Sequence, residues 1–199
     1  MLFLAPIVEG HGELEAVPAL LHRIADAAGK PGGVLVNAPI RVKSGSFLND
    51  REYFRKHVTL ATGKAASRQG AVIILLDCDD DRNCPAILGP RLLGQAQAVR
   101  ADVPILVALA WREYETWLIS AVRSLAGRYG LPLDIQPPPD PEGIRGAKEW
   151  LGDRMTNRYD PITHQVAFTR SLDLEQARTI SSFNRLFERV VDMIRAREK

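Results

Sequence analysis

Carboxylates gather where an apolar stretch of this sequence ends. The run Ala71–Leu76 carries no charge and is rich in Ile and Leu, and Asp77, Asp79 and Asp81 follow it at alternate positions. Alternate side chains of an extended chain point the same way, so these three carboxylates can converge. Like charges held close together repel unless a cation lies between them. The pattern therefore favours a cation site over a solvated acidic turn, which is less usual directly after a fully apolar strand.

A second group of carboxylates follows the apolar run Leu2–Val8. Glu9 ends that run, and Glu13 begins an amphipathic helical pattern after two glycines. The carboxyl ends of the strands in a parallel α/β sheet lie on one edge, where ligands bind. If the two strands are neighbours, Glu9 faces the Asp cluster. Glu13 is either a metal ligand or an acidic residue in a first helical turn, where negative charge suits the helix dipole.

These carboxylates predict chemistry with a divalent cation. Oxygen ligands without Cys or His suit Mg²⁺ or Mn²⁺. One or two such ions could polarise a phosphate oxygen, activate water and stabilise a leaving oxygen. We predict Asp77 and Asp79 as metal ligands and Glu9 as either a ligand or the general acid/base, so these three are the candidate catalytic residues. Glu13 and Asp81 are further candidate ligands.

Basic residues near the same predicted edge could bind phosphate. Arg41, Lys43 and Arg112 are candidates for neutralising it, although ordinary surface charge explains them equally well. Glu115 is a further candidate for substrate binding. The helix predicted at about 50–66 carries Arg51 and several other basic residues, which indicates either a solvated face or a strip that contacts phosphates.

Composition limits the class of protein. The chain has 199 residues and a formal net charge of +2, so we expect one domain with no overall attraction to nucleic acid or membrane. No run is long enough to span a membrane, and no signal peptide is visible. Cys78 and Cys84 lack a secretory context, which favours free thiols. We expect a cytoplasmic protein.

The order of elements predicts an α/β fold. Apolar strands alternate with helical patterns, which implies a parallel, Rossmann-like sheet of about four strands with right-handed crossovers and flanking helices. The broken strand signal around Pro39 reads as an edge strand. Ser181 or Ser182 is the expected cap of the last helix. We divide the chain into an α/β domain (1–130), a Pro-rich linker (131–142) and a helical extension packed on the same domain (143–199).

Two motifs carry a family resemblance. The segments Val8–Glu13 and Leu76–Asp79 together resemble the Toprim domain, which topoisomerases, bacterial primases and nucleases of the overcoming-lysogenization-defect type share. That pattern places a glutamate after the first strand and Asp-x-Asp after the third strand of a parallel α/β sheet. Glu115–Leu118, Ser171–Leu174, Ala177–Arg178 and Ser182–Phe183 look like the bacterial Toprim-like family catalogued as domain of unknown function 4276.

The resemblance implies roles for particular residues. Glu9, Asp77 and Asp79 match the acid/base and metal positions, and Glu13, Asp81 and Glu115 match less closely. No tyrosine nucleophile can be assigned, so strand passage is not implied, and a separate ATPase could be a partner protein.

The expected function is metal-dependent phosphodiester cleavage, or a related phosphoryl transfer, on DNA or RNA. The alternatives are a non-catalytic module that binds nucleic acid or nucleotide with a partner protein, a receiver-like phosphoacceptor, and a phosphohydrolase acting on a small nucleotide.

Overall fold

The computed structural model describes residues 1–79 and 84–197 of the chain. Within these ranges strands alternate with helices, and the strands form a parallel five-stranded sheet. The predicted α/β class is therefore confirmed. The predicted ligand Asp81 lies outside the described residues.

The sheet places the ends of the two acidic strands side by side. Its order is β2-β1-β4-β5, and β3 pairs with β1 further along than β2 does. The strands are β1 (Leu2–Val8), β2 (Val34–Val36), β3 (Ile40–Arg41), β4 (Ala71–Cys78) and β5 (Ile105–Trp111). Because β1 and β4 are parallel neighbours in the register Ile7 to Ile74, Glu9 and Asp77 come to the same edge.

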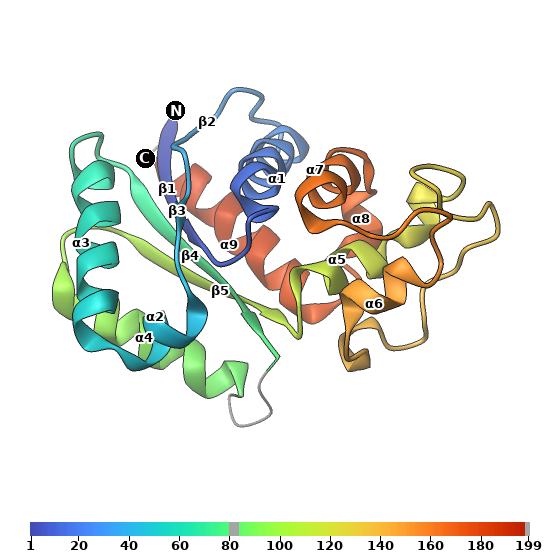
Figure 1. Ribbon diagram of the computed structural model, residues 1–199. Coiled ribbons are helices and arrows are strands. Elements are labelled where there is room, and N and C mark those ends of the chain that lie inside the picture. Colours follow the sequence, from blue (N-terminus) through green and yellow to red (C-terminus); the bar gives the residue numbers. More distant parts are fainter. Residues whose placement is uncertain (80–83, 198–199) are drawn as a thin grey trace.

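Helices cover both faces of the sheet. The helices are α1 (Glu13–Ala27), α2 (Ser44–Asn49), α3 (Arg51–Ala66), α4 (Pro85–Val99), α5 (Tyr114–Ser120), η1 (Val122–Leu125), η2 (Pro141–Gly143), α6 (Ala147–Gly152), α7 (Pro161–Ser171), α8 (Leu174–Ala177) and α9 (Ser181–Ala196). Helices α3 and α4 lie on one face, and α1 and α9 lie on the other (Figure 1). Helices α5 to α8 form a lobe beyond the carboxyl ends of β4 and β5 (Figure 1).

The alternation of side chains along β4 divides the interior into two cores. Ile73 and Leu75 pack in the core beneath α1 and α9. Val72, Ile74 and Leu76 pack in the core beneath α3 and α4. A strand buried on both faces must be apolar throughout, which is why β4 reads as a continuous hydrophobic run until Asp77.

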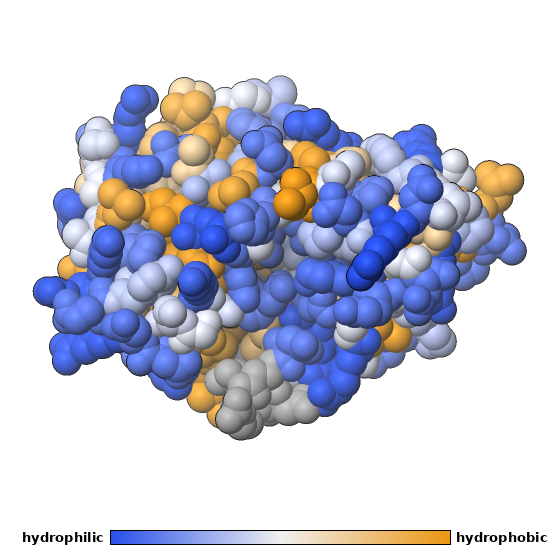
Figure 2. Space-filling view, in the orientation of Figure 1, coloured by the Kyte–Doolittle hydropathy of each residue, from blue (hydrophilic) through white to orange (hydrophobic). Residues whose placement is uncertain are grey.

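The surface in the orientation of Figure 1 is mostly polar. Hydrophilic residues cover much of the lobe formed by α5 to α8, and apolar residues are interspersed among them (Figure 2). Large apolar side chains that are exposed, such as Leu60, Leu133 and Ile162, come from separate elements. Single exposed apolar residues of this kind are normal for a folded protein.

The start of α9 differs from the prediction. Ser181 and Ser182 lie in the first turn, and their own hydroxyls do not cap the helix. The carboxylate of Glu142 instead accepts hydrogen bonds from the backbone N–H groups of Ser182 at 2.9 Å and Ser181 at 3.3 Å. The prediction of a serine cap was wrong because the capping oxygen comes from η2, about forty residues earlier in the sequence.

Gly12 lies where α1 meets α7. A Cβ atom at this position would collide with Oε1 of Gln165 and with the backbone carbonyl of Pro161. The φ of Gly12 is −65°, so the need for glycine here is steric and not conformational. The absent side chain lets the loop after β1 approach α7 closely.

We expect Gly12→Ala to lower the free energy of unfolding by about 1–3 kcal/mol, because overpacking forces neighbouring atoms to move. Urea unfolding followed by circular dichroism measures the change. Gly94→Ala is the matched control, since a Cβ atom on Gly94 in α4 meets nothing within 4 Å and alanine favours a helix. A Gly12→Ala protein as stable as the wild type would show that α7 does not lie this close.

Candidate functional site

A pocket of about 560 Å³ opens at the carboxyl ends of β1 and β4. Glu9, Asp77 and Asp79 line it, so the structure brings together the three predicted catalytic candidates. Ser44 and Arg91 also line it. The larger pocket, of about 630 Å³, runs along the outer edge of β5 and contains none of the predicted carboxylates. The smaller pocket is therefore the candidate site.

Glu9 presents one carboxylate oxygen that lacks a partner. Its Oε1 accepts a hydrogen bond from the Ser44 hydroxyl at 2.5 Å. Its Oε2 is buried and has no hydrogen-bond partner among the described residues. A buried charged oxygen is costly unless it is paired. The carboxylate is thus held by α2 and has one oxygen left for a ligand.

Asp77 joins the site to the lobe. Its Oδ1 accepts the backbone N–H of Tyr114, the first residue of α5, at 2.8 Å. Its Oδ2 lies 3.8 Å from Nζ of Lys148, and 19% of the side chain is exposed. Burial raises the pKa of Asp77 well above its usual range, and the charges of Glu13 and Glu115 raise it further while Lys148 lowers it.

Glu13 is an interior residue. It is buried, and its Oε2 accepts the backbone N–H of Glu9 at 3.0 Å. Burial raises the pKa of Glu13 to about 7, hydrogen bonds from the backbone of Gly10 and Glu9 oppose that shift, and the charges of Glu9 and Glu115 add to it. Glu13 therefore closes the turn after β1 and does not act only as a solvated residue of the first helical turn.

Glu115 is fully buried in α5. Its Oε1 accepts hydrogen bonds from the Tyr159 hydroxyl at 3.0 Å and from Nε2 of Gln165 at 2.7 Å. Its Oε2 lies 3.0 Å from Nζ of Lys148. The predicted role of Glu115 in substrate binding has no support in this geometry, because its partners are all side chains of the helical extension.

Lys148 in α6 places a cation among these carboxylates. Its Nζ donates to Oε2 of Glu113 and lies near Glu115 and Asp77. Burial lowers the pKa of Lys148, but the three carboxylates outweigh burial and raise its pKa above the ordinary value. The following acidic residues are called the carboxylate cluster: Glu9, Glu13, Asp77, Glu113 and Glu115.

Arg112 lies beside the site in an unusual conformation. Its φ is +73°, a left-handed value that is uncommon for a residue other than glycine. Its backbone pairs with Cys78 in an antiparallel bridge, and its guanidinium stacks over Trp111, 4.7 Å from the ring centroid. Nη1 lies 4.0 Å from Oδ1 of Asp79, whose side chain is 53% exposed. Of the predicted phosphate-binding residues, Arg112 thus lies beside Asp79, next to the pocket but not on its wall.

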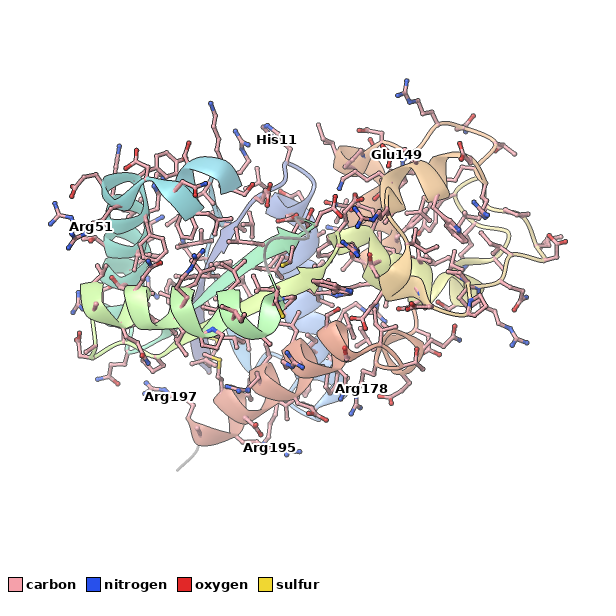
Figure 3. The ribbon with its side chains drawn as sticks, turned by 90° about the horizontal axis from the view of Figure 1, so that it is seen from below. His11, Arg51, Glu149, Arg178, Arg195 and Arg197 are labelled. Atoms are coloured by element: carbon pink, nitrogen blue, oxygen red, sulfur yellow. The ribbon has the colours of Figure 1, made fainter. Side chains whose placement is uncertain are left out.

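The other predicted basic residues lie further out. Arg41 ends β3 and Lys43 precedes α2, and both side chains are exposed. Neither of them lines the pocket. Arg51 extends outward from the start of α3, away from the sheet (Figure 3), and Arg55 is paired with Glu52 at 2.9 Å. The basic face of α3 therefore lies away from the candidate site.

Sequence reasoning missed several residues of the site. Ser44, Arg91 and Lys148 were not predicted, and no motif marks them. Within residues 1–79 and 84–197, no group of three or more His, Cys, Asp or Glu residues is arranged to hold a metal ion. The metal-binding roles predicted for Asp77, Asp79 and Glu9 therefore stay predictions. The unpaired oxygen of Glu9 supports them.

Comparison with known proteins gives a family and little more. The family model described as "Domain of unknown function (DUF4276)" matches residues 8–191. No curated protein and no solved structure matches the chain. Among the helices of the described part of the chain, none combines the length and apolar character needed to cross a membrane.

Proposed function

This chain belongs to the DUF4276 family, a domain of unknown function, and we propose that it is a Toprim-like enzyme that depends on Mg²⁺ or Mn²⁺. Its reaction is the cleavage of phosphodiester bonds in nucleic acid or a related phosphoryl transfer. The observation that carries the proposal is the buried, unpartnered Oε2 of Glu9 on the wall of a pocket shared with Asp77 and Asp79.

The residues present fit a hard divalent cation. The acidic side chains that line the pocket, Glu9, Asp77 and Asp79, offer carboxylate oxygens. Mg²⁺ and Mn²⁺ prefer oxygen ligands of this kind. Burial, and after it the neighbouring carboxylates, raise the pKa values of Asp77 and Glu13, and a bound cation would favour the ionised form of both groups. Glu9 and Asp77 would hold the ion, with Asp79 at the open side of the pocket.

The fold agrees with the Toprim resemblance at the level of topology. Glu9 follows the first strand, and Asp77 and Asp79 lie at the end of a strand that is its parallel neighbour. The Toprim pattern places Asp-x-Asp after the third strand, whereas here it follows β4, the fourth strand of the chain; the parallel pairing of β1 with β4 is what supports the proposal. The relation to nucleases of the overcoming-lysogenization-defect type belongs to the same proposal.

The protein's own side chains would position the substrate. A bound divalent ion supplies polarisation of a phosphate oxygen and of the attacking water. Ser44 fixes the orientation of the Glu9 carboxylate through its hydrogen bond. Arg112, held over Trp111, and Arg91 on the pocket wall carry positive charge suited to phosphate oxygens.

A second candidate function follows from the size of the pocket. A volume of about 560 Å³ falls in the range of pockets that hold small molecules. The basic face of α3 lies away from this pocket, so a small nucleotide would fit without any contact to that helix. We therefore keep hydrolysis of a small nucleotide as the alternative, with a non-catalytic role beside a partner ATPase behind both.

The deciding experiment is a set of cleavage assays with the purified full chain. Single-stranded, duplex and nicked DNA, RNA, and nucleoside triphosphates are each incubated with Mg²⁺, with Mn²⁺ and with EDTA. We expect cleavage of at least one nucleic acid with Mn²⁺ and none with EDTA. Release of phosphate from nucleotides alone would move the alternative ahead. Neither activity, together with no binding of nucleic acid at low salt, would refute the proposed function.

A further inference from the structure

The ammonium group of Lys148 lies against three members of the carboxylate cluster, Asp77, Glu113 and Glu115. Lys148 comes from α6, in the helical extension, whereas Asp77 ends β4, and Glu113 and Glu115 flank the start of α5. Nζ of Lys148 donates to Oε2 of Glu113 and lies 3.0 Å from Oε2 of Glu115 and 3.8 Å from Oδ2 of Asp77.

The Lys148 side chain is 36% exposed, but its two nearest carboxylate partners are buried. Glu115 is completely buried, and the side chain of Glu113 is only 11% exposed. A lysine ammonium is a compact point charge with three N–H donors, and three carboxylates from two elements converge on it here. The backbone N–H of Ala147 also donates to Oε1 of Glu113 at 2.9 Å, which fixes the start of α6 against α5.

Asp77 lies between Lys148 and the pocket that contains Glu9. One of its oxygens lies toward Lys148, and the residue also lines that pocket. In sites with two metal ions, the ions lie about 3.5–4 Å apart and share oxygen ligands between them. The ammonium of Lys148, 3.8 Å from Oδ2 of Asp77, is a positive charge at a comparable distance from that carboxylate.

We propose that Lys148 is a built-in cation that limits this site to one divalent metal ion. This inference rests on the proposed metal-dependent function. In it, Glu9 and Asp77 hold the single ion, and Lys148 neutralises Glu113 and Glu115 where a second ion would otherwise lie. Lys148 is thus a positioning residue, which fixes Asp77 between the ion and the lobe.

The test counts bound Mn²⁺ by calorimetry and by electron paramagnetic resonance, with no substrate and no activity readout. We expect one Mn²⁺ per chain for the wild type and two for Lys148→Ala, whose vacated position is lined by carboxylates. The two ions should give the broadened spectrum of a spin-coupled pair. Lys148→Arg keeps the positive charge and should remain at one ion. Lys56→Ala, which removes an exposed lysine of α3, should also remain at one.

The outcomes separate the two proposals. Two ions on the wild type would overturn the inference about Lys148 and leave the metal-dependent function standing. One ion on both the wild type and a folded Lys148→Ala would show that Lys148 is only a structural ion-pair partner. No bound Mn²⁺ on the wild type would reject the metal site itself. If Lys148→Ala does not fold, Lys148→Gln, which removes the charge but keeps most of the side chain, is counted in its place, and one ion on that folded variant overturns the inference.

Discussion

Replacing Glu9 by glutamine is expected to abolish metal-dependent cleavage and to leave nucleic-acid binding nearly unchanged. Glutamine keeps the shape of the side chain and one oxygen that can accept the hydrogen bond from Ser44. It removes the negative charge and the titratable proton, so both a ligand role and an acid/base role are lost. Removal of a group of this kind lowers the rate by about 10²–10⁴-fold.

The rate is measured under single-turnover conditions with Mn²⁺, and binding is measured separately by fluorescence anisotropy with Ca²⁺ or EDTA. Glu15→Gln is the matched control, because Glu15 is an exposed glutamate in the first turn of α1 and should cleave at the wild-type rate. A Glu9→Gln protein that cleaves within a few-fold of wild type would remove Glu9 from the site.

The second large effect concerns stability. Glu115→Ala should lower the free energy of unfolding by about 3 kcal/mol, the low end of the 3–5 kcal/mol that loss of one partner of a buried pair costs. The substitution leaves the Tyr159 hydroxyl and Gln165 without their acceptor. Two terms reduce the cost, since Lys148 keeps Glu113 as a partner and the repulsion between Glu115 and Asp77 disappears.

Denaturant unfolding in EDTA measures this change without any contribution from metal binding. Tyr159→Phe removes a single hydrogen bond to Glu115 and should cost only about 1 kcal/mol. Glu149→Ala should have almost no effect, because Glu149 is an exposed residue of α6 (Figure 3). If Glu115→Ala is as stable as Glu149→Ala, the buried network does not hold the lobe to the sheet.

The sequence predicted those parts of the fold that local pattern determines. The continuous apolar run of β4 and the alternation of strands with helices required a parallel sheet with both faces covered. A helix was predicted at about 50–66 with Asn49 or Asp50 as its cap, and Asp50 accepts the backbone N–H groups of Glu52 and Tyr53 at the start of α3. In each case the signal lies within a few neighbouring residues.

Local pattern failed where the chain changes direction. The segment 142–151 reads as one helix, but the structure divides it into η2 and α6, with Gly146 between them at a φ of +65°. Arg112 takes a left-handed conformation, and because it is not a glycine the sequence gives no sign of this. A tertiary contact, the bridge to Cys78, holds it there, and no window of sequence reports such a contact.

The candidate site was predictable only in its carboxylates. Glu9 and Asp77 follow apolar strands, and the rule that strand ends meet at one edge brought them together. Lys148 looks like an ordinary helical lysine, and its role depends on partners more than thirty residues earlier in the sequence. Ser44 likewise depends on a contact with Glu9 thirty-five positions away. Partners so distant in sequence leave no periodic signal.

The position of Lys148 in the sequence has a consequence for protein synthesis. A ribosome releases the chain from its amino end, so every acidic residue of the carboxylate cluster emerges before Lys148 does. A nascent chain that ends near residue 140 has the whole sheet but lacks Lys148, Tyr159 and Gln165, the three partners of Glu115. At that stage Glu113 and Glu115 lack the ammonium group that lies against them in the folded chain. The contacts that surround Glu115 can therefore form only after α6 and α7 have been synthesised.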